Sequence, residues 1–71
     1  MNYLYKVNQR VRIVGNTTIQ HYAPLGQVAK IKSRTSWGNR EAYVVSCKTI
    51  NGMPTQLIIQ GDLRPEGARV V

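Results

Sequence analysis

The chain has 71 residues, and its ten Lys and Arg against three Asp and Glu give a formal net charge of +7. A chain of this length can form one small domain, which excludes a multidomain protein and a large enzyme with a deep active site. One cysteine and one histidine exclude an internal disulfide and a zinc site built from four such ligands.

The location of the protein follows from two further features of the composition. No apolar run approaches the roughly 20 residues of a membrane helix. The lone Cys47 suits a reducing compartment. We therefore expect a cytoplasmic protein that has no membrane partner.

The first strand is predicted over residues 9–14. Short clusters of Val, Ile and Tyr between Gly, Pro and Asn are typical of strands, and no helical stripe is present. Strict alternation puts Val11 and Ile13 on one face and Arg10 and Arg12 on the other.

The second strand is predicted from about residue 25 to residue 33. Val28 and Ile31 are three residues apart, so a bulge or strong twist between them is needed to place both inside. The opposite face then carries three cations: Lys30, Lys32 and Arg34.

A turn over residues 35–40, with Gly38 and Asn39 at its tip, leads to a third strand over 41–47. The third strand has no charge on either face after Glu41, which predicts a central strand that is covered on both sides.

The remaining chain predicts two more strands. Asn51-Gly52 is a strong hairpin signal before a fourth strand over 55–60. Residues 61–65 are interpreted as a tight turn, followed by a last strand over 68–71. Five short strands favour an all-β fold, a small barrel, formed by one domain over residues 1–71. The predicted core consists of Val11, Ile13, Val28, Ile31, Val45, Leu57, Ile59 and Leu63.

A surface of cations is the main functional signal. If the first two strands pair, then one face carries Arg10, Arg12, Lys30, Lys32 and Arg34. Such a face is costly without an anionic partner, and phosphate contacts would neutralise it. Two alternatives remain open: a solvated face that keeps the protein soluble, and a face that docks on an acidic protein surface.

Trp37 is the second candidate, at the tip of the predicted turn between Arg34 and Arg40. A tryptophan there can stack on an exposed base while the arginines contact phosphates. It can also anchor a protein partner, or fold back as a lid on the core.

Catalytic groups are scarce. His21 has no carboxylate or cysteine near it in sequence and is expected at the surface, and Cys47 is expected to be a small buried hydrophobe without a base beside it. Asp62 is interpreted as a turn residue, and three carboxylates are too few for paired acid–base catalysis or a magnesium site. We expect no enzymatic activity, no cofactor and no metal.

The order of Val11-Arg12-Ile13-Val14-Gly15, the Gly26-x-Val28-x-x-Ile31 pattern, Tyr43-Val44-Val45 and Asp62-Leu63-Arg64-Pro65 resembles a small five-stranded SH3-like barrel. The Gly26 pattern is similar to the KOW type of ribosomal proteins and transcription elongation factors. The resemblance covers roughly residues 7–65 and implies a module that binds DNA or RNA.

A weaker resemblance links Thr55-Gln56-Leu57-Ile58 to the Gln-Ile-Tyr segment of plasmid type II dihydrofolate reductases, with Ile58 at the tyrosine position. That resemblance implies a tetrameric enzyme.

The sequence thus favours a non-enzymatic nucleic-acid-binding module, a regulator or accessory protein of transcription or translation, or of a phage or plasmid. The expected binding residues are Arg10, Arg12, Lys30, Lys32, Arg34, Trp37 and Arg40. A protein-interaction module and the reductase are the alternatives.

Overall fold

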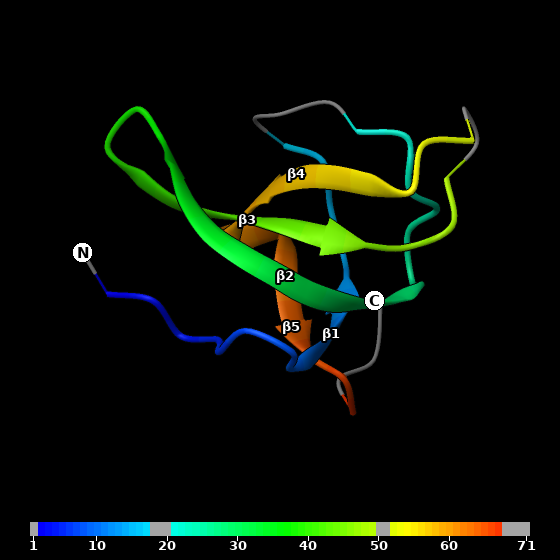
Figure 1. Cartoon of the computed structure of the whole chain (residues 1–71), viewed down its shortest axis with the longest axis horizontal. Coiled ribbons are helices and arrows are strands. Elements are labelled where there is room, and N and C mark those ends of the chain that lie inside the picture. The colour runs from blue at the N-terminus through cyan, green and yellow to red at the C-terminus, as the bar shows by residue number, and fades with distance from the viewer. Residues whose placement is uncertain (1, 18–20, 50–51, 68–71) are drawn as a thin grey trace.

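The computed structural model describes residues 2–17, 21–49 and 52–67, and it is all-β. Five antiparallel strands form one sheet in the order β4-β3-β2-β1-β5 (Figure 1). A single 3-10 turn, η1, is the only helical element in these ranges. The elements are β1 (Arg10–Ile13), β2 (Val28–Trp37), β3 (Arg40–Ser46), β4 (Thr55–Ile59), η1 (Gln60–Asp62) and β5 (Leu63–Pro65).

The end of the chain differs from the prediction. The interpretation of residues 61–65 as a turn is wrong beyond Asp62, because Leu63 to Pro65 form β5 and pair with β1. Leu63 lies opposite Ile13, and both side chains are buried, so packing against β1 extends the chain where the turn residues alone suggested a bend. The strand predicted at residues 68–71 lies outside the described residues.

The hairpin of β2 and β3 is longer than predicted. β2 continues to Trp37, which pairs with Arg40 across a two-residue turn. Gly38, the first central residue of that turn, has a φ of +60°. A glycine with positive φ at this position is the pattern of a type II′ turn, whose twist matches that of the flanking strands.

The sheet has an inner face that carries the core and an outer face that points away from it. Cross-strand partners share a face, so the register assigns each side chain to one of them. The core cluster joins residues of all five strands, the N-terminal segment and the loop before β2: Tyr5, Val11, Ile13, Ala23, Ala29, Ile31, Tyr43, Val45, Ile58 and Leu63.

Most of the predicted core is confirmed, with two errors. Val28 is half-buried and lies opposite Arg12 on the outer face, so the bulge predicted before Ile31 is in the wrong place. The observed register shift falls between Ile31 and Ser33, which makes Lys32 the extra residue.

The second error concerns β4, where the prediction is off by one residue. Ile58 lies opposite Tyr43 and is fully buried in the core. Leu57 is half-buried on the outer face. Ile59 is buried as predicted, but it lies opposite Ala42, outside the core cluster. Three consecutive apolar residues carry no alternation, so only the pairing with β3 decides which of them points inward.

An N-terminal strap, residues 2–6, joins β2 to the edge strand β5. The Tyr3 hydroxyl donates to the Thr35 carbonyl of β2. The Tyr5 hydroxyl donates to the Leu63 carbonyl of β5 over 3.1 Å. The strap therefore links the middle strand, β2, to the edge strand β5, two positions away in the sheet.

Tyr43 and Gln60 hold this strap from inside. The Tyr43 hydroxyl accepts from the Tyr5 amide at 3.2 Å and donates to Gln60 Oε1. Gln60 Oε1 also accepts from the Leu4 amide, and Gln60 Nε2 donates to the Asn2 carbonyl, both over 2.9 Å. Tyr43 thus couples the strap to the core.

Candidate functional site

The outer face of β2, β1 and β5 brings like charges directly opposite one another. Arg10 lies opposite Lys30, and Arg12 lies opposite Arg64. Directly opposed side chains have Cβ atoms about 4.5–5.5 Å apart, and like charges there are destabilising. Arg64 was missed by the sequence analysis because its segment was interpreted as a turn.

Three of these four cations already have partners in the chain, since one amino group of Arg64 donates to the Gly61 and Leu63 carbonyls. Arg10 forms an ion pair with Glu66 at 3.0 Å, and both side chains are largely solvent-exposed. Arg12 donates to the Gly26 carbonyl over 2.6 Å and to the Glu66 carbonyl over 3.1 Å. Arg12 therefore ties the turn before β2 to the segment after β5. Among the described residues, Lys30 and the remaining guanidinium nitrogens of Arg64 have no such partner and can meet a ligand.

The bulge at Lys32 removes Arg34 from the predicted group of five cations. Beyond the bulge, Arg34 lies opposite Tyr43 and shares its face. Arg34 Nε donates to the Tyr5 carbonyl over 3.1 Å, and the guanidinium carbon is 5.5 Å from the centre of the Tyr3 ring. Arg34 thus holds the strap, while Lys32 is exposed at the bulge itself.

The same bulge turns Trp37 toward the outer face. Counted from the pairs after the bulge, Ser33, Thr35 and Trp37 share the face of Lys30. Trp37 is 49% exposed and lies outside the core cluster, so the alternative of a lid on the core is wrong. Its partner Arg40 is also exposed. An extended strand rises about 3.3 Å per residue, which puts Trp37 roughly 20 Å from Lys30.

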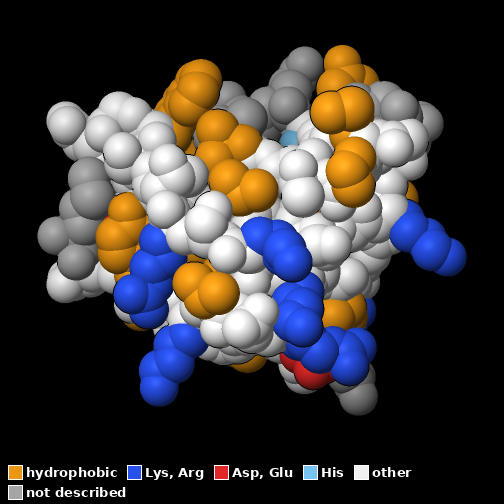
Figure 2. Space-filling model, in the orientation of Figure 1, with side chains coloured by type: hydrophobic (Ala, Val, Ile, Leu, Met, Phe, Trp, Pro, Cys, Tyr) orange, Lys and Arg blue, Asp and Glu red, His pale blue; other side chains and the backbone are white. Residues whose placement is uncertain are grey.

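Figure 2 shows how these groups are distributed on one side of the molecule. Lys and Arg side chains lie mainly over its lower half, beside an acidic side chain, and hydrophobic side chains gather over the upper half. On this side of the molecule, positive charge is therefore concentrated in the lower half of the view.

His21 and Asp62 are structural groups at the first loop. His21 was expected at the surface but is buried; its Nε2 lies 2.7 Å from the Gly15 carbonyl, and its Nδ1 accepts from the Ala23 amide at 3.3 Å. Asp62 is also buried and accepts from the Thr17 amide at 3.0 Å and the Thr17 hydroxyl at 2.9 Å. Both side chains are occupied in holding the loop after β1.

The other two side chains that the sequence raised as candidates for catalysis, Cys47 and Gln56, also form hydrogen bonds within the chain. Burial raises the pKa of the half-buried Cys47 thiol, and a hydrogen bond with Gln27 partly offsets this effect. The Gln56 carbonyl oxygen, which the reductase resemblance singled out, accepts from the Tyr22 amide at 3.2 Å. Among the described residues, no three His, Cys, Asp or Glu side chains are grouped to hold a metal ion.

In the part of the chain that the structure describes, no helix is long and apolar enough to cross a membrane. Comparison with protein families, curated proteins and solved structures found no match to this chain.

Proposed function

We propose that this protein is a non-enzymatic cytoplasmic module that binds nucleic acid through its outer face, and that its sheet is a small SH3-like barrel. The barrel is supported by the strand order, in which β5 lies beside β1 and follows a 3-10 turn. It is also supported by the strap, which links β2 to β5, and by the backbone bond from the Val14 amide to the Asp62 carbonyl, which continues the contact of β1 with the segment before β5.

The observation that carries the function is the pair of like-charge contacts across β1. Arg10 opposite Lys30, and Arg12 opposite Arg64, would repel one another in the free protein. Within the described residues, Glu66 is the acidic side chain that forms an ion pair with this group. A phosphate backbone supplies the missing negative charge, and the release of its counterions adds to affinity.

Trp37 and Arg40 support a single-stranded ligand. They lie opposite each other at the tip of the β2–β3 hairpin, on the face that also carries Lys30. An exposed indole beside a guanidinium suits a stacked base with its phosphate, and such stacking contributes about 1–3 kcal/mol per base. A single strand of nucleic acid that lies along β2 would meet the cations around Lys30 at one end and the Trp37 ring at the other.

The test measures binding of labelled single-stranded DNA and RNA of mixed sequence over a range of salt concentrations. Affinity should fall steeply with salt, and Lys30→Glu should weaken binding and make the logarithmic salt dependence shallower by about one unit or more. Lys6→Glu is the matched control, because it makes the same charge change at an exposed strap residue that belongs to none of the strands of the outer face. Trp37→Ala should weaken single-strand binding by about 1–3 kcal/mol without lowering the melting temperature.

Three outcomes would count against the proposal. No binding of either nucleic acid at low salt would refute it. Equal losses of affinity for Lys30→Glu and Lys6→Glu would mean that binding depends on the net charge of the protein and not on its outer face. Binding to an acidic protein in preference to nucleic acid, through Trp37, would favour the protein-interaction alternative instead.

A further inference from the structure

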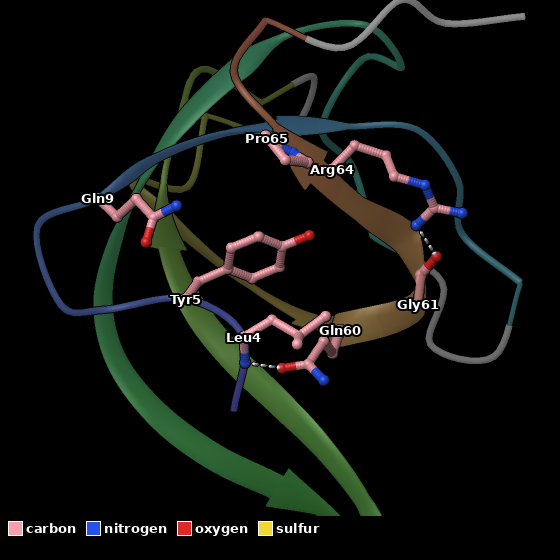
Figure 3. A pocket seen from close by; sticks show the side chains of 7 residues that line it. All are labelled: Leu4, Tyr5, Gln9, Gln60, Gly61, Arg64 and Pro65. Carbon is pink, nitrogen blue, oxygen red and sulfur yellow. Dashed lines mark hydrogen bonds between the residues drawn. The ribbon is translucent and has the colours of Figure 1, made fainter. Parts of the chain in front are cut away.

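A cleft of about 600 Å³ lies between the N-terminal strap and the segment from η1 to β5. Its described lining residues are Leu4, Tyr5, Gln9, Gln60, Gly61, Arg64 and Pro65. Figure 3 shows the Tyr5 ring at its centre, with Gln9 on one side and Leu4 and Gln60 on the other. The volume lies in the range of sites for small organic ligands.

Three of the described residues that line the cleft, Leu4, Tyr5 and Pro65, provide apolar surface. Tyr5 is buried and belongs to the core, so it forms a fixed floor. Leu4 is 69% exposed, and Pro65 is also exposed. Covering such an exposed aliphatic side chain with a flat apolar group removes apolar surface from water, which favours binding.

The polar groups of the cleft are mainly donors. Gln9 Oε1 accepts from the Lys6 amide at 3.0 Å, and its Nε2 has no hydrogen-bond partner among the described residues. One amino group of Arg64 donates to the carbonyls of Gly61 and Leu63. The other nitrogens of that guanidinium have no partner within the same part of the chain. None of the described lining residues is acidic.

Arg64 connects the cleft with the outer face. It lies opposite Arg12 across β1 and β5, and it also lines the cleft. Burial raises the pKa of the Tyr5 phenol, and the positive charge of Arg64 partly offsets this effect, so that charge acts close to the cleft floor. A ligand that follows the cations of the outer face would reach the cleft at Arg64.

We propose that this cleft binds one unpaired nucleotide, with its base against Leu4 and Tyr5 and its phosphate at Arg64. The inference rests on the proposed function, and it adds a second contact point for the same strand. The free amide hydrogens of Gln9 are available to an acceptor on the base edge, as glutamine side chains are in other nucleic-acid complexes.

Gly61 offers a way to block the cleft. A Cβ at Gly61 would have no neighbour within 4 Å, and the same is true of Gly67, which does not line the cleft. Gly61→Phe should therefore fill the cleft without disturbing the core, and Gly67→Phe is its matched control. Leu4→Glu is a second variant, because it puts a carboxylate at the entrance from a side chain that the fold hardly uses.

The first measurement is an NMR titration of the full chain with 5′-AMP and, separately, with inorganic phosphate. We expect saturable shifts of the Leu4, Gln9 and Gly61 amides with 5′-AMP. Gly61→Phe and Leu4→Glu should each weaken this binding at least tenfold, and Gly67→Phe should leave it unchanged. No saturable shift at these amides, or equal affinity for phosphate alone, would overturn the proposal.

A second measurement separates this inference from the proposed function. A short single strand should bind Gly61→Phe about tenfold more weakly than the wild type, and still with a steep salt dependence. Unchanged affinity of that variant would refute the cleft while leaving the outer face intact. If the wild type binds no strand at low salt, the proposed function itself is wrong, and the cleft inference with it.

Discussion

Replacing Tyr43 with phenylalanine tests how the strap is held against the sheet. The ring is fully buried, so Tyr43→Phe preserves the packing and removes only the hydroxyl. That hydroxyl accepts from the Tyr5 amide at 3.2 Å and donates to Gln60 Oε1. Gln60 Oε1 keeps the Leu4 amide as a donor, whereas the buried Tyr5 amide loses its acceptor.

The expected cost follows from that difference. A buried donor left without a partner costs about 1–3 kcal/mol, and the lost bond to Gln60 adds a smaller amount, so we expect a loss of about 2–3 kcal/mol. Small domains have a total stability of about 5 kcal/mol or somewhat more. Urea unfolding should show a midpoint lower by about 2 M at an unchanged slope near 1–1.5 kcal/mol per M.

Tyr22→Phe is the control, because Tyr22 is 55% exposed and outside the core. The free energy of unfolding of this control should stay within about 0.5 kcal/mol of the wild-type value. Hydrogen exchange of the Tyr5 amide should accelerate in Tyr43→Phe and remain slow in the control. If both variants unfold at the wild-type midpoint, the Tyr43 hydroxyl does not hold the strap.

Two further predictions concern stability. Gly15→Ala puts a Cβ 2.8 Å from Asp62 Oδ1, so thermal unfolding should show a loss of stability of about 1–3 kcal/mol. Gly67→Ala, which has open space around its Cβ, should be nearly neutral. Equal melting temperatures of the two variants would contradict the close approach of Gly15 to Asp62. Burial raises the pKa of Tyr5 above its ordinary value of 10.0, so folding favours the neutral phenol. The contribution of the phenol to the free energy of unfolding is therefore complete below pH 10 and is lost as the pH rises through the raised pKa. Urea midpoints at pH 8 and 11 should therefore converge between the wild type and Tyr5→Phe at the higher pH, and a constant difference would refute this linkage.

The candidate site could be predicted only in part. Arg10, Lys30, Trp37 and Arg40 were identified from charge and turn signals, and the structure assigns all four to the outer face. The sequence did not predict the hydrogen bonds of the strap tyrosines or the cleft beneath the strap, because these contacts join residues more than 30 positions apart.

The sequence by itself determined the all-β class, the approximate positions of the first four strands and the net positive charge. These properties follow from local composition and from the two-residue period of a strand, which each segment carries alone. Arg10 to Ile13 illustrates this point, since the alternation of charged and apolar residues specifies both faces of β1 without any partner.

The tertiary structure alone decided which side chains share a face where the alternation of a strand is interrupted, in β2 and β4. The bulge at Lys32 arises from the pairing of β2 with β3, and it turns Arg34 inward and Trp37 outward. In β4, the partner Tyr43 selects Ile58 for the core from three adjacent apolar residues. A shift of one residue reverses every side chain beyond it, and the register that sets this shift exists only once two strands have paired.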